Sequence, residues 1–190
     1  MNDISYKLIA ERFTEHLDVF GKTMDKADVI VEIADRCRSS LQSGNKILFC
    51  GNGGSAADAQ HLAAELVGRF KKERRSLAAV ALTTDTSILT AVANDYGYEE
   101  VFARQVEGIG RSGDVFIGIS TSGNSPNVVK AAEVARDTGM HTVAFTGEGG
   151  GKLAEICDVC LDIPSDVTAR IQEMHILAGH MLCELIEIEY

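Results

Sequence analysis

Five short apolar runs, separated by stretches with helical periodicity, constrain the fold of this chain more than any other feature. They are apolar on both faces, which suits the strands of a parallel sheet covered by helices on both sides. The alternation of strands and helices predicts an α/β fold with right-handed crossovers. The predicted strands are residues 46–50, 77–82, 114–120, 141–146 and 159–163.

Amphipathic helices are predicted at both ends of the chain. Residues 3–20 and 26–43 should form two helices whose apolar faces must be covered by something, and residues 168–189 should form one long final helix. At 190 residues, 45% of them hydrophobic, the chain fits one domain over residues 1–190. We expect the N-terminal helices to precede an α/β core that begins at about residue 44.

The cellular compartment is predicted from the absence of membrane-span and signal-peptide patterns and from the cysteines. No apolar run approaches the roughly 18 to 20 residues of a membrane span, and the N-terminus has no signal-peptide pattern. The five cysteines, an odd number, lie in or beside apolar segments of a chain without an export signal, which indicates buried thiols in a reducing compartment. The one CxxC pair, Cys157 and Cys160, falls in a predicted strand and is weak evidence for zinc or redox chemistry. The expected localisation is cytoplasmic.

The net charge of -10 and the pI of about 4.9 exclude nucleic acid and anionic membranes as expected partners. An anionic ligand must therefore be bound by local chemistry. The basic segment "RFKKERR", residues 69–75, follows a predicted helix and contains a glutamate. We interpret it as a solvated helix end and loop.

Hydroxyl side chains gather in the loop after the third predicted strand. Together with a glycine, at the start of a helix that opens with Pro126, they offer neutral donors and the positive end of the helix dipole. This arrangement suits a phosphate monoester and needs no lysine. A serine-rich turn with one N-cap explains one hydroxyl but not four. The candidate phosphate ligands are Ser120, Thr121, Ser122 and Ser125.

The glycine-rich loop "GNGGS", residues 51–55, follows the first predicted strand and suggests a backbone that approaches a ligand closely. It is not a Walker A loop. It does fit the GxGxx(G/A) dinucleotide fingerprint, but the acidic residue expected about 20 positions later is missing. A dinucleotide-dependent oxidoreductase stays an alternative on this loop alone.

His61 and Glu65, four residues apart on the helix after that loop, can reach one metal ion or one substrate; a surface ion pair is the alternative. In the last helix His180 lies among apolar residues and needs a partner or a role. Periodicity favours Glu173 over Gln172 as its companion, because Gln172 lies about 80° away around the helix. His175 is expected at the helix surface or an interface.

With these residues identified, the chain resembles the phosphoheptose isomerases of the sugar isomerase (SIS) superfamily over essentially its full length. The segments that carry the resemblance are "GNGGSAADAQH", "ALTTDTSILTAVANDYGYE", "GISTSGNSPNV" and "ARIQEMHILAGH", in the family's order and spacing. The resemblance implies a flavodoxin-like three-layer sandwich and a homotetramer with active sites between subunits. It implies isomerisation of D-sedoheptulose 7-phosphate to D-glycero-D-manno-heptose 7-phosphate, the first step of heptose synthesis for lipopolysaccharide or capsule.

The resemblance also implies roles for individual residues. Glu65 would be the base that moves a proton between C1 and C2 through an enediol, and His180 its acid partner. The family's zinc ligands, for one ion per subunit, match His61, Glu65, Gln172 and His180, so the resemblance selects Gln172 where periodicity favours Glu173. Ser120, Thr121, Ser122 and Ser125 would bind the phosphate, and the substrate would also be bound by Asn52, Gly53, Gly54, Asn94, Asp95 and Gln172.

Two further alternatives remain within the superfamily. One is a non-catalytic paralogue that binds the bacterial replication initiator; it lacks the Glu and His that match Glu65 and His180, which this chain has. The other is an isomerase of a different sugar phosphate, because nothing in the sequence measures the length of the sugar.

Overall fold

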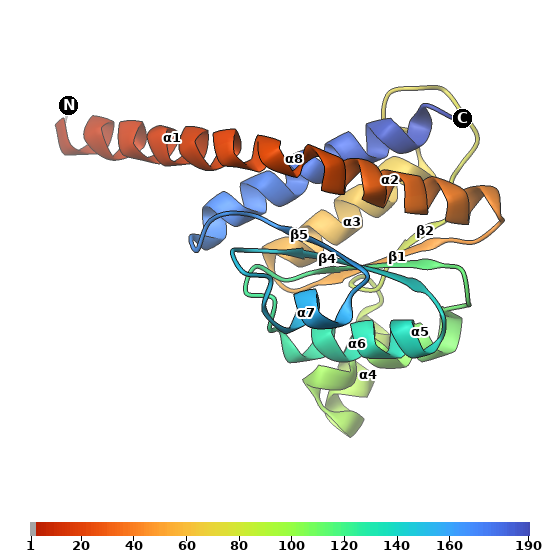
Figure 1. Ribbon diagram of the computed structural model, residues 1–190. Helices are drawn as coiled ribbons and strands as arrows, with labels where there is room; N and C mark the ends of the chain where they lie inside the picture. The colour runs from red at the N-terminus through yellow and green to blue at the C-terminus, as the bar shows by residue number, and fades with distance from the viewer. Residues whose placement is uncertain (1–2) are drawn as a thin grey trace.

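A computed structural model describes residues 3–190, and a five-stranded parallel sheet lies at its centre (Figure 1). The strand order is β2-β1-β3-β4-β5, and every neighbouring pair is parallel. This confirms the predicted α/β fold and its flavodoxin-like strand order. The strands are β1 (Ile47–Gly51), β2 (Ala79–Ala81), β3 (Val115–Ile119), β4 (His141–Thr146) and β5 (Val159–Asp162).

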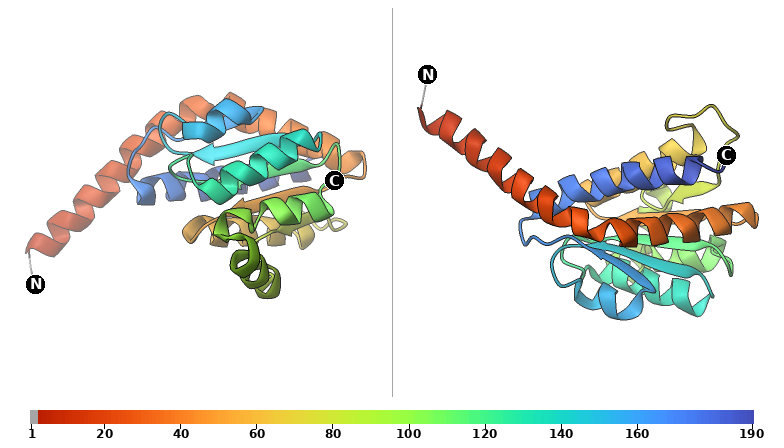
Figure 2. Two further views of the ribbon diagram at one scale, coloured as in Figure 1. Left: turned by 90° about the horizontal axis from the view of Figure 1, so that it is seen from below. Right: turned by 45° about the horizontal axis from the view of Figure 1, so that its top comes forward.

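Helices cover both faces of the sheet, which makes three layers (Figures 1 and 2). α2, α3 and α8 pack on one face, and α5, α6 and α7 pack on the other. The helices are α1 (Asp3–Thr23), α2 (Ala27–Gln42), α3 (Gly54–Val67), α4 (Thr86–Tyr96), α5 (Ala103–Ile109), α6 (Pro126–Asp137), α7 (Gly151–Ile156) and α8 (Thr168–Glu187), with short 3-10 turns at η1 (Met24–Lys26) and η2 (Tyr98–Glu100).

The sequence of β1 shows why its run is apolar throughout. Ile47 and Phe49 point into the core beneath α2, α3 and α8, whereas Leu48 and Cys50 point into the core on the opposite face. Successive side chains of a strand alternate between faces, so a strand buried on both sides must be apolar at every position. The same alternation accounts for β3 and most of β4.

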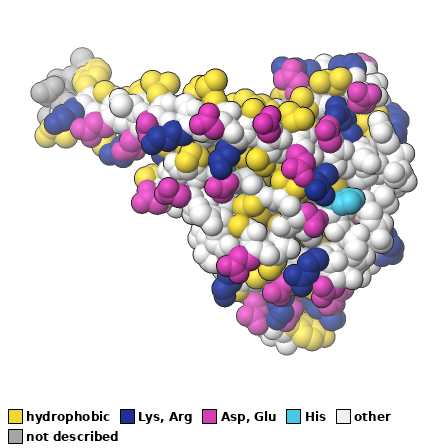
Figure 3. Space-filling view, in the orientation of Figure 1, with side chains coloured by type: hydrophobic (Ala, Val, Ile, Leu, Met, Phe, Trp, Pro, Cys, Tyr) yellow, Lys and Arg dark blue, Asp and Glu magenta, His cyan; other side chains and the backbone are white. Residues whose placement is uncertain are grey.

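Two helices leave apolar surface outside the core. α1 extends as an arm away from the body (Figure 2), and hydrophobic side chains gather along it (Figure 3). α4 has no buried residue. Even so, no helix within residues 3–190 is long and apolar enough to cross a membrane. The exposed large apolar residues of α1 are Ile4, Tyr6, Leu8, Ile9, Phe13, Leu17 and Phe20.

The ligand crevice is expected between β1 and β3. The chain proceeds from β1 to β2 on one side and from β3 to β4 and β5 on the other, so the connections diverge at this point. Sheets of this kind bind ligands at the carboxyl ends of the strands where the connections diverge. In the register, Gly51 of β1 lies opposite Ile119 of β3, which brings the glycine-rich loop beside the hydroxyl-rich loop.

Candidate active site

The hydroxyl-rich loop between β3 and α6 is folded on itself by short contacts. The Oγ atoms of Ser120 and Ser125 are 2.8 Å apart, and the Ser122 Oγ accepts a hydrogen bond from the backbone N–H of Asn124 at 3.2 Å. Ser125 is the N-cap residue of α6, but its side chain forms no capping bond. Pro126 has no N–H, and the Val128 N–H already donates to the Ser125 carbonyl oxygen at 3.0 Å. The features that suit an anion here are therefore the hydroxyl groups and the positive end of the α6 dipole.

Gly123 lets this loop approach the loop after β4. Its φ is +65°, and a Cβ at this position would lie 2.0 Å from the carbonyl oxygen of Gly150. The Asn124 side chain closes the same contact by accepting the backbone N–H of Lys152 at 3.1 Å. Only glycine satisfies both the left-handed conformation and the close approach. The hydroxyl-bearing loop is therefore supported by a second loop on its outer side.

The two loops of the crevice are joined by a pair of amides. Asn52 donates to the Asn127 side-chain oxygen at 2.9 Å, and Asn127 donates back to Asn52 at 2.8 Å. Tyr98 adds a hydrogen bond from its hydroxyl to the Asn52 oxygen at 3.2 Å. Asn127 is buried in the first turn of α6. The predicted sugar ligand Asn52 is thus fixed to the helix that follows the hydroxyl-rich loop.

Gly53 and Gly54 open α3 at the other side of the same loop. Gly53 has a φ of +55° and is the N-cap of α3. A Cβ on Gly54 would lie 2.6 Å from the Gln172 Nε2, so the Gln172 carboxamide occupies the space above this glycine. The structure therefore brings Gln172 of α8 to the loop where the sugar is expected.

His61, Glu65 and His180 form a cluster between α3 and α8. The Nε2 atoms of the two histidines are 3.0 Å apart, and the Glu65 Oε1 is 3.2 Å from the His61 Nε2. The Glu65 side chain is 25% exposed and that of His61 48% exposed. A surface ion pair between His61 and Glu65 does not explain why His180, which belongs to another helix, lies beside them. The predicted grouping of these three residues is present in the fold.

Close packing of α3 on α8 creates this cluster. A Cβ on Gly179 would lie 2.6 Å from a methyl carbon of Leu62, so the two helices touch where Gly179 has no side chain. Leu62 and Gly179 are the chain neighbours of His61 and His180. Residues 119 positions apart therefore meet because one small residue allows the helices to approach.

Asp58, one turn before His61 on α3, is a member of this site that the sequence analysis did not single out. Its Oδ2 is buried and has no hydrogen-bond partner within residues 3–190. Burial raises the pKa of Asp58, and the nearby imidazoles of His61 and His180 oppose that rise. A buried, unpartnered carboxylate oxygen beside two imidazoles favours a positive charge at this place.

The imidazole and carboxylate groups of His61, Glu65 and His180 are typical zinc ligands, and two of the distances between them suit a zinc ion. Two ligands of a tetrahedral zinc with bonds of about 2.0 to 2.1 Å lie about 3.3 Å apart. The two measured separations in the cluster are close to that value. Both involve His61, however, and within residues 3–190 no three His, Cys, Asp or Glu side chains are grouped as a metal site. A closed site therefore requires a side-chain rotation or the Gln172 oxygen as a further ligand.

The structure corrects three predictions made for polar residues. Glu173 is not the partner of His180, because it pairs with His16 at 2.7 Å and with Arg170. His175 is not at the surface: it is 1% exposed, it is 3.0 Å from the Thr146 carbonyl oxygen, and burial lowers its pKa to about 4. The neutral ring donates this hydrogen bond, so His175 belongs to the core.

The basic segment after α3 is the third correction. It was predicted to be solvated, and Arg69 and Glu73 do lie at the surface. The Arg74 side chain, in contrast, is 0% exposed and pairs with Glu187 at 3.1 Å. The segment is therefore fixed to the end of α8.

Asn94 and Asp95 are not brought to the rest of the site within one chain. They lie exposed near the end of α4, and the hydrogen bond recorded for them joins the two side chains at 2.8 Å. Because α4 projects from the body in Figure 1, a predicted contribution of these residues to the sugar site needs another element beside them.

A family model described as the SIS domain matches residues 11–147 of this chain. The chain is 59% identical over 172 residues to a phosphoheptose isomerase of Akkermansia muciniphila, covering 90% of this chain and 91% of that protein. A phosphoheptose isomerase of Roseiflexus is 54% identical over 187 residues, which cover 98% of this chain and 95% of the relative.

Solved structures give the same result for the fold and the sequence together. The phosphoheptose isomerase of Neisseria gonorrhoeae superposes with a TM-score of 0.92 at 48% identity, covering 96% of this chain and 98% of that one. That of Francisella tularensis superposes with a TM-score of 0.93 at 39% identity, covering 98% of both chains. Such identity over nearly complete chains places this chain within one enzyme family. The protein belongs to the phosphoheptose isomerases, sugar-phosphate isomerases built on the SIS domain.

Proposed function

We propose that this enzyme converts D-sedoheptulose 7-phosphate to D-glycero-D-manno-heptose 7-phosphate through an enediol. The observation that carries the proposal is the cluster of Glu65, His61 and His180, present in a chain of the phosphoheptose isomerase family. An aldose-ketose isomerase needs one base that serves C1 and C2 and one group that handles their oxygens. The cluster offers a carboxylate for the first task and an imidazole for the second.

The proposed roles are those that the family resemblance implies. Glu65 would remove the proton from one carbon and return it to the other, and His180 would exchange protons with the carbonyl and hydroxyl oxygens. Asn52, held by Asn127 and Tyr98, would orient the sugar. The hydroxyls of the Ser120–Ser125 contact and the start of α6 would bind the phosphate.

We also propose one zinc ion per subunit, bound by His61, Glu65, Gln172 and His180. Such an ion would polarise the sugar carbonyl and stabilise the enediolate oxygens. The unpartnered oxygen of Asp58 beside the two imidazoles supports a cation at this place. A carboxylate bound to zinc is a weaker base, so the proposal requires that the coordination of Glu65 loosens when the substrate binds.

Turnover of sedoheptulose 7-phosphate by the purified protein tests the function. We expect heptose 7-phosphate as product, loss of most activity after chelation, and recovery with zinc. Metal content, measured on the same samples, should rise to one zinc per chain on recovery. Activity that persists in metal-free protein would remove zinc from the proposal, and no heptose product under any metal condition would overturn the reaction.

A different sugar phosphate is the second candidate, because the phosphate loop would serve shorter sugars equally well. Comparison of kcat/KM for five-, six- and seven-carbon ketose phosphates decides between them, and we expect the seven-carbon sugar to be preferred. We place the product in heptose synthesis for lipopolysaccharide or capsule, and the reaction in the cytoplasm. The replication-initiator alternative is set aside, because the chain belongs to an enzyme family and has both Glu65 and His180.

We propose a homotetramer in which a neighbouring subunit completes each site. An apolar hollow of about 540 Å³ lies between α1, α2 and α8, and is continuous with the exposed apolar face of α1. An apolar surface of this kind suits burial by a second copy. In the proposed tetramer, Asn94 and Asp95 of α4 would reach the site of a neighbouring subunit. Light scattering should give four times the chain mass of 20.4 kDa. A mass of one chain would contradict the proposal.

A further inference from the structure

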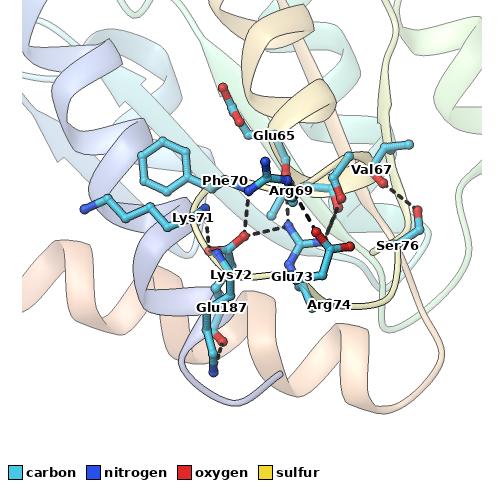
Figure 4. A network of polar contacts seen from close by, with 12 residues as sticks. Glu65, Val67, Arg69, Phe70, Lys71, Lys72, Glu73, Arg74, Ser76 and Glu187 are labelled. Carbon is cyan, nitrogen blue, oxygen red and sulfur yellow. Dashed lines mark hydrogen bonds and ion pairs between the residues drawn. The ribbon is translucent and has the colours of Figure 1, made fainter.

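Residues 68–76, part of the connection from α3 to β2, are held against the end of α8 by a buried ion pair (Figure 4). The Arg74 guanidinium is fully buried, pairs with Glu187, and donates to the carbonyl oxygens of Glu65 and Leu66 at 2.9 Å each. These two carbonyls lie in the last turn of α3, where helix carbonyls have no partner within the helix. Arg74 therefore joins the turn that contains Glu65 to the last turn of α8.

Glu187 binds the same segment through its backbone. Its carboxylate accepts N–H groups from Phe70 at 2.7 Å, Lys71 at 2.9 Å and Lys72 at 3.0 Å. Burial alone would raise the pKa of Glu187, but the three N–H groups and Arg74 outweigh it and hold the pKa below its usual value. The carboxylate stays ionised at neutral pH and fixes three consecutive peptide groups.

This anchoring determines where the Phe70 side chain lies. The ring is stacked on the imidazole of His180, with centroids 5.5 Å apart and an interplanar angle of 24°. In Figure 4 the residues that surround Phe70 belong to the same network as Glu187 and Arg74. One face of the His180 ring is thus covered by the Phe70 ring. The backbone of Phe70 cannot shift without breaking several buried contacts.

We infer that Phe70 is a positioning residue for His180, held in place by Glu187 and Arg74. Stacking restricts rotation of the imidazole about its side-chain bonds, so the His180 Nε2 stays directed toward His61. The inference rests on the proposed function in one respect, which is that His180 takes part in the reaction. A purely structural Phe70 would only add apolar contact area to the core.

Replacement of the ring tests the inference. Phe70→Leu keeps an apolar side chain but removes the flat face, whereas Phe70→Tyr keeps the face. We expect Phe70→Leu to lower kcat about tenfold with KM changed less than about twofold, in the range seen for residues that orient an active group. Phe70→Tyr should restore kcat. Thermal unfolding should show that both variants remain folded at the assay temperature.

A second measurement does not depend on turnover. In protein with labelled histidine, the ring proton on Cε1 of His180 should be shifted by the ring current of Phe70. That shift should be lost in Phe70→Leu and kept in Phe70→Tyr. In the wild type, cross-relaxation between the two rings should be visible. An unchanged His180 signal in Phe70→Leu, or no contact between the rings in the wild type, would overturn the inference.

Glu187→Gln extends the test to the anchor, with Glu184→Gln as its matched control. Both residues lie in the last turn of α8, and Glu184 pairs at the surface with the Lys71 side chain at 2.8 Å. Glu187→Gln should change kcat and the His180 signal in the same direction as Phe70→Leu, and Glu184→Gln should change neither. Wild-type kcat in Phe70→Leu, despite a shifted His180 signal, would reduce Phe70 to a structural role. Inactive wild type with an intact ring contact would contradict the proposed reaction alone.

Discussion

Replacement of Glu65 by Gln should lower turnover of sedoheptulose 7-phosphate by about 10³-fold, because the amide cannot accept the proton that leaves the substrate carbon. The change keeps the size of the side chain and leaves a carbonyl oxygen near the His61 Nε2, which is 3.2 Å from the carboxylate in the wild type. Initial rates and incorporation of solvent deuterium at C1 and C2 should fall together.

Glu73→Gln is the matched control for this change. Glu73 follows the same helix, its side chain is 90% exposed, and its partner is the exposed Arg69. It should keep wild-type turnover, because a surface pair contributes little. The decisive contrary result is near-native turnover by Glu65→Gln in protein that has lost its metal. Glu65 would then be a metal ligand without a role as base.

Removal of two hydroxyls from the phosphate loop should have the second large effect. The Oγ atoms of Ser120 and Ser125 are 2.8 Å apart. The double substitution Ser120→Ala and Ser125→Ala removes both hydroxyls, whereas a single substitution would leave one of them without its partner. Hydrogen bonds to a charged group contribute about 1.5 to 3 kcal/mol each, so the loss of two should raise KM by at least about 100-fold. The kcat should change much less, since these groups do not contact the reacting carbons.

Inorganic phosphate gives an independent measure of the same loop. Its inhibition constant should rise in parallel with KM, because it needs the hydroxyls but not the sugar site. Ser39→Ala, at an exposed position of α2, should leave both values unchanged. An unchanged KM in the double variant would assign the phosphate to another part of the crevice.

Regular spacing in the sequence was sufficient to predict the sheet. Each strand is a local run such as residues 47–51, and each neighbouring helix has its own apolar periodicity, so the α/β fold was predicted from segments of about ten residues. The four hydroxyls of the loop after β3, and the helical spacing of His61 and Glu65, could be identified for the same reason. These features depend on residues that are neighbours in the chain.

Contacts between distant segments were beyond such reasoning. The pair of Asn52 and Asn127 is 75 residues apart, and that of Arg74 and Glu187 spans 113, so neither leaves a local pattern. The basic segment could be recognised by its charge, but the burial of Arg74 could not be predicted from it. A buried charge needs a partner, and that partner, Glu187, belongs to a distant helix.

The sequence by itself determined the order of the elements, the loops that carry hydroxyls and glycines, and the presence of a histidine and a glutamate on one helix face. Only the tertiary structure decided that Glu173 turns to His16 and that Phe70 lies on His180. It also gave the distance between His61 and His180, whose grouping the family resemblance had implied. The physical reason is the packing of α8 on α3 at Gly179. Helical periodicity fixes directions around one axis, but the approach of two axes depends on side-chain volume at the contact.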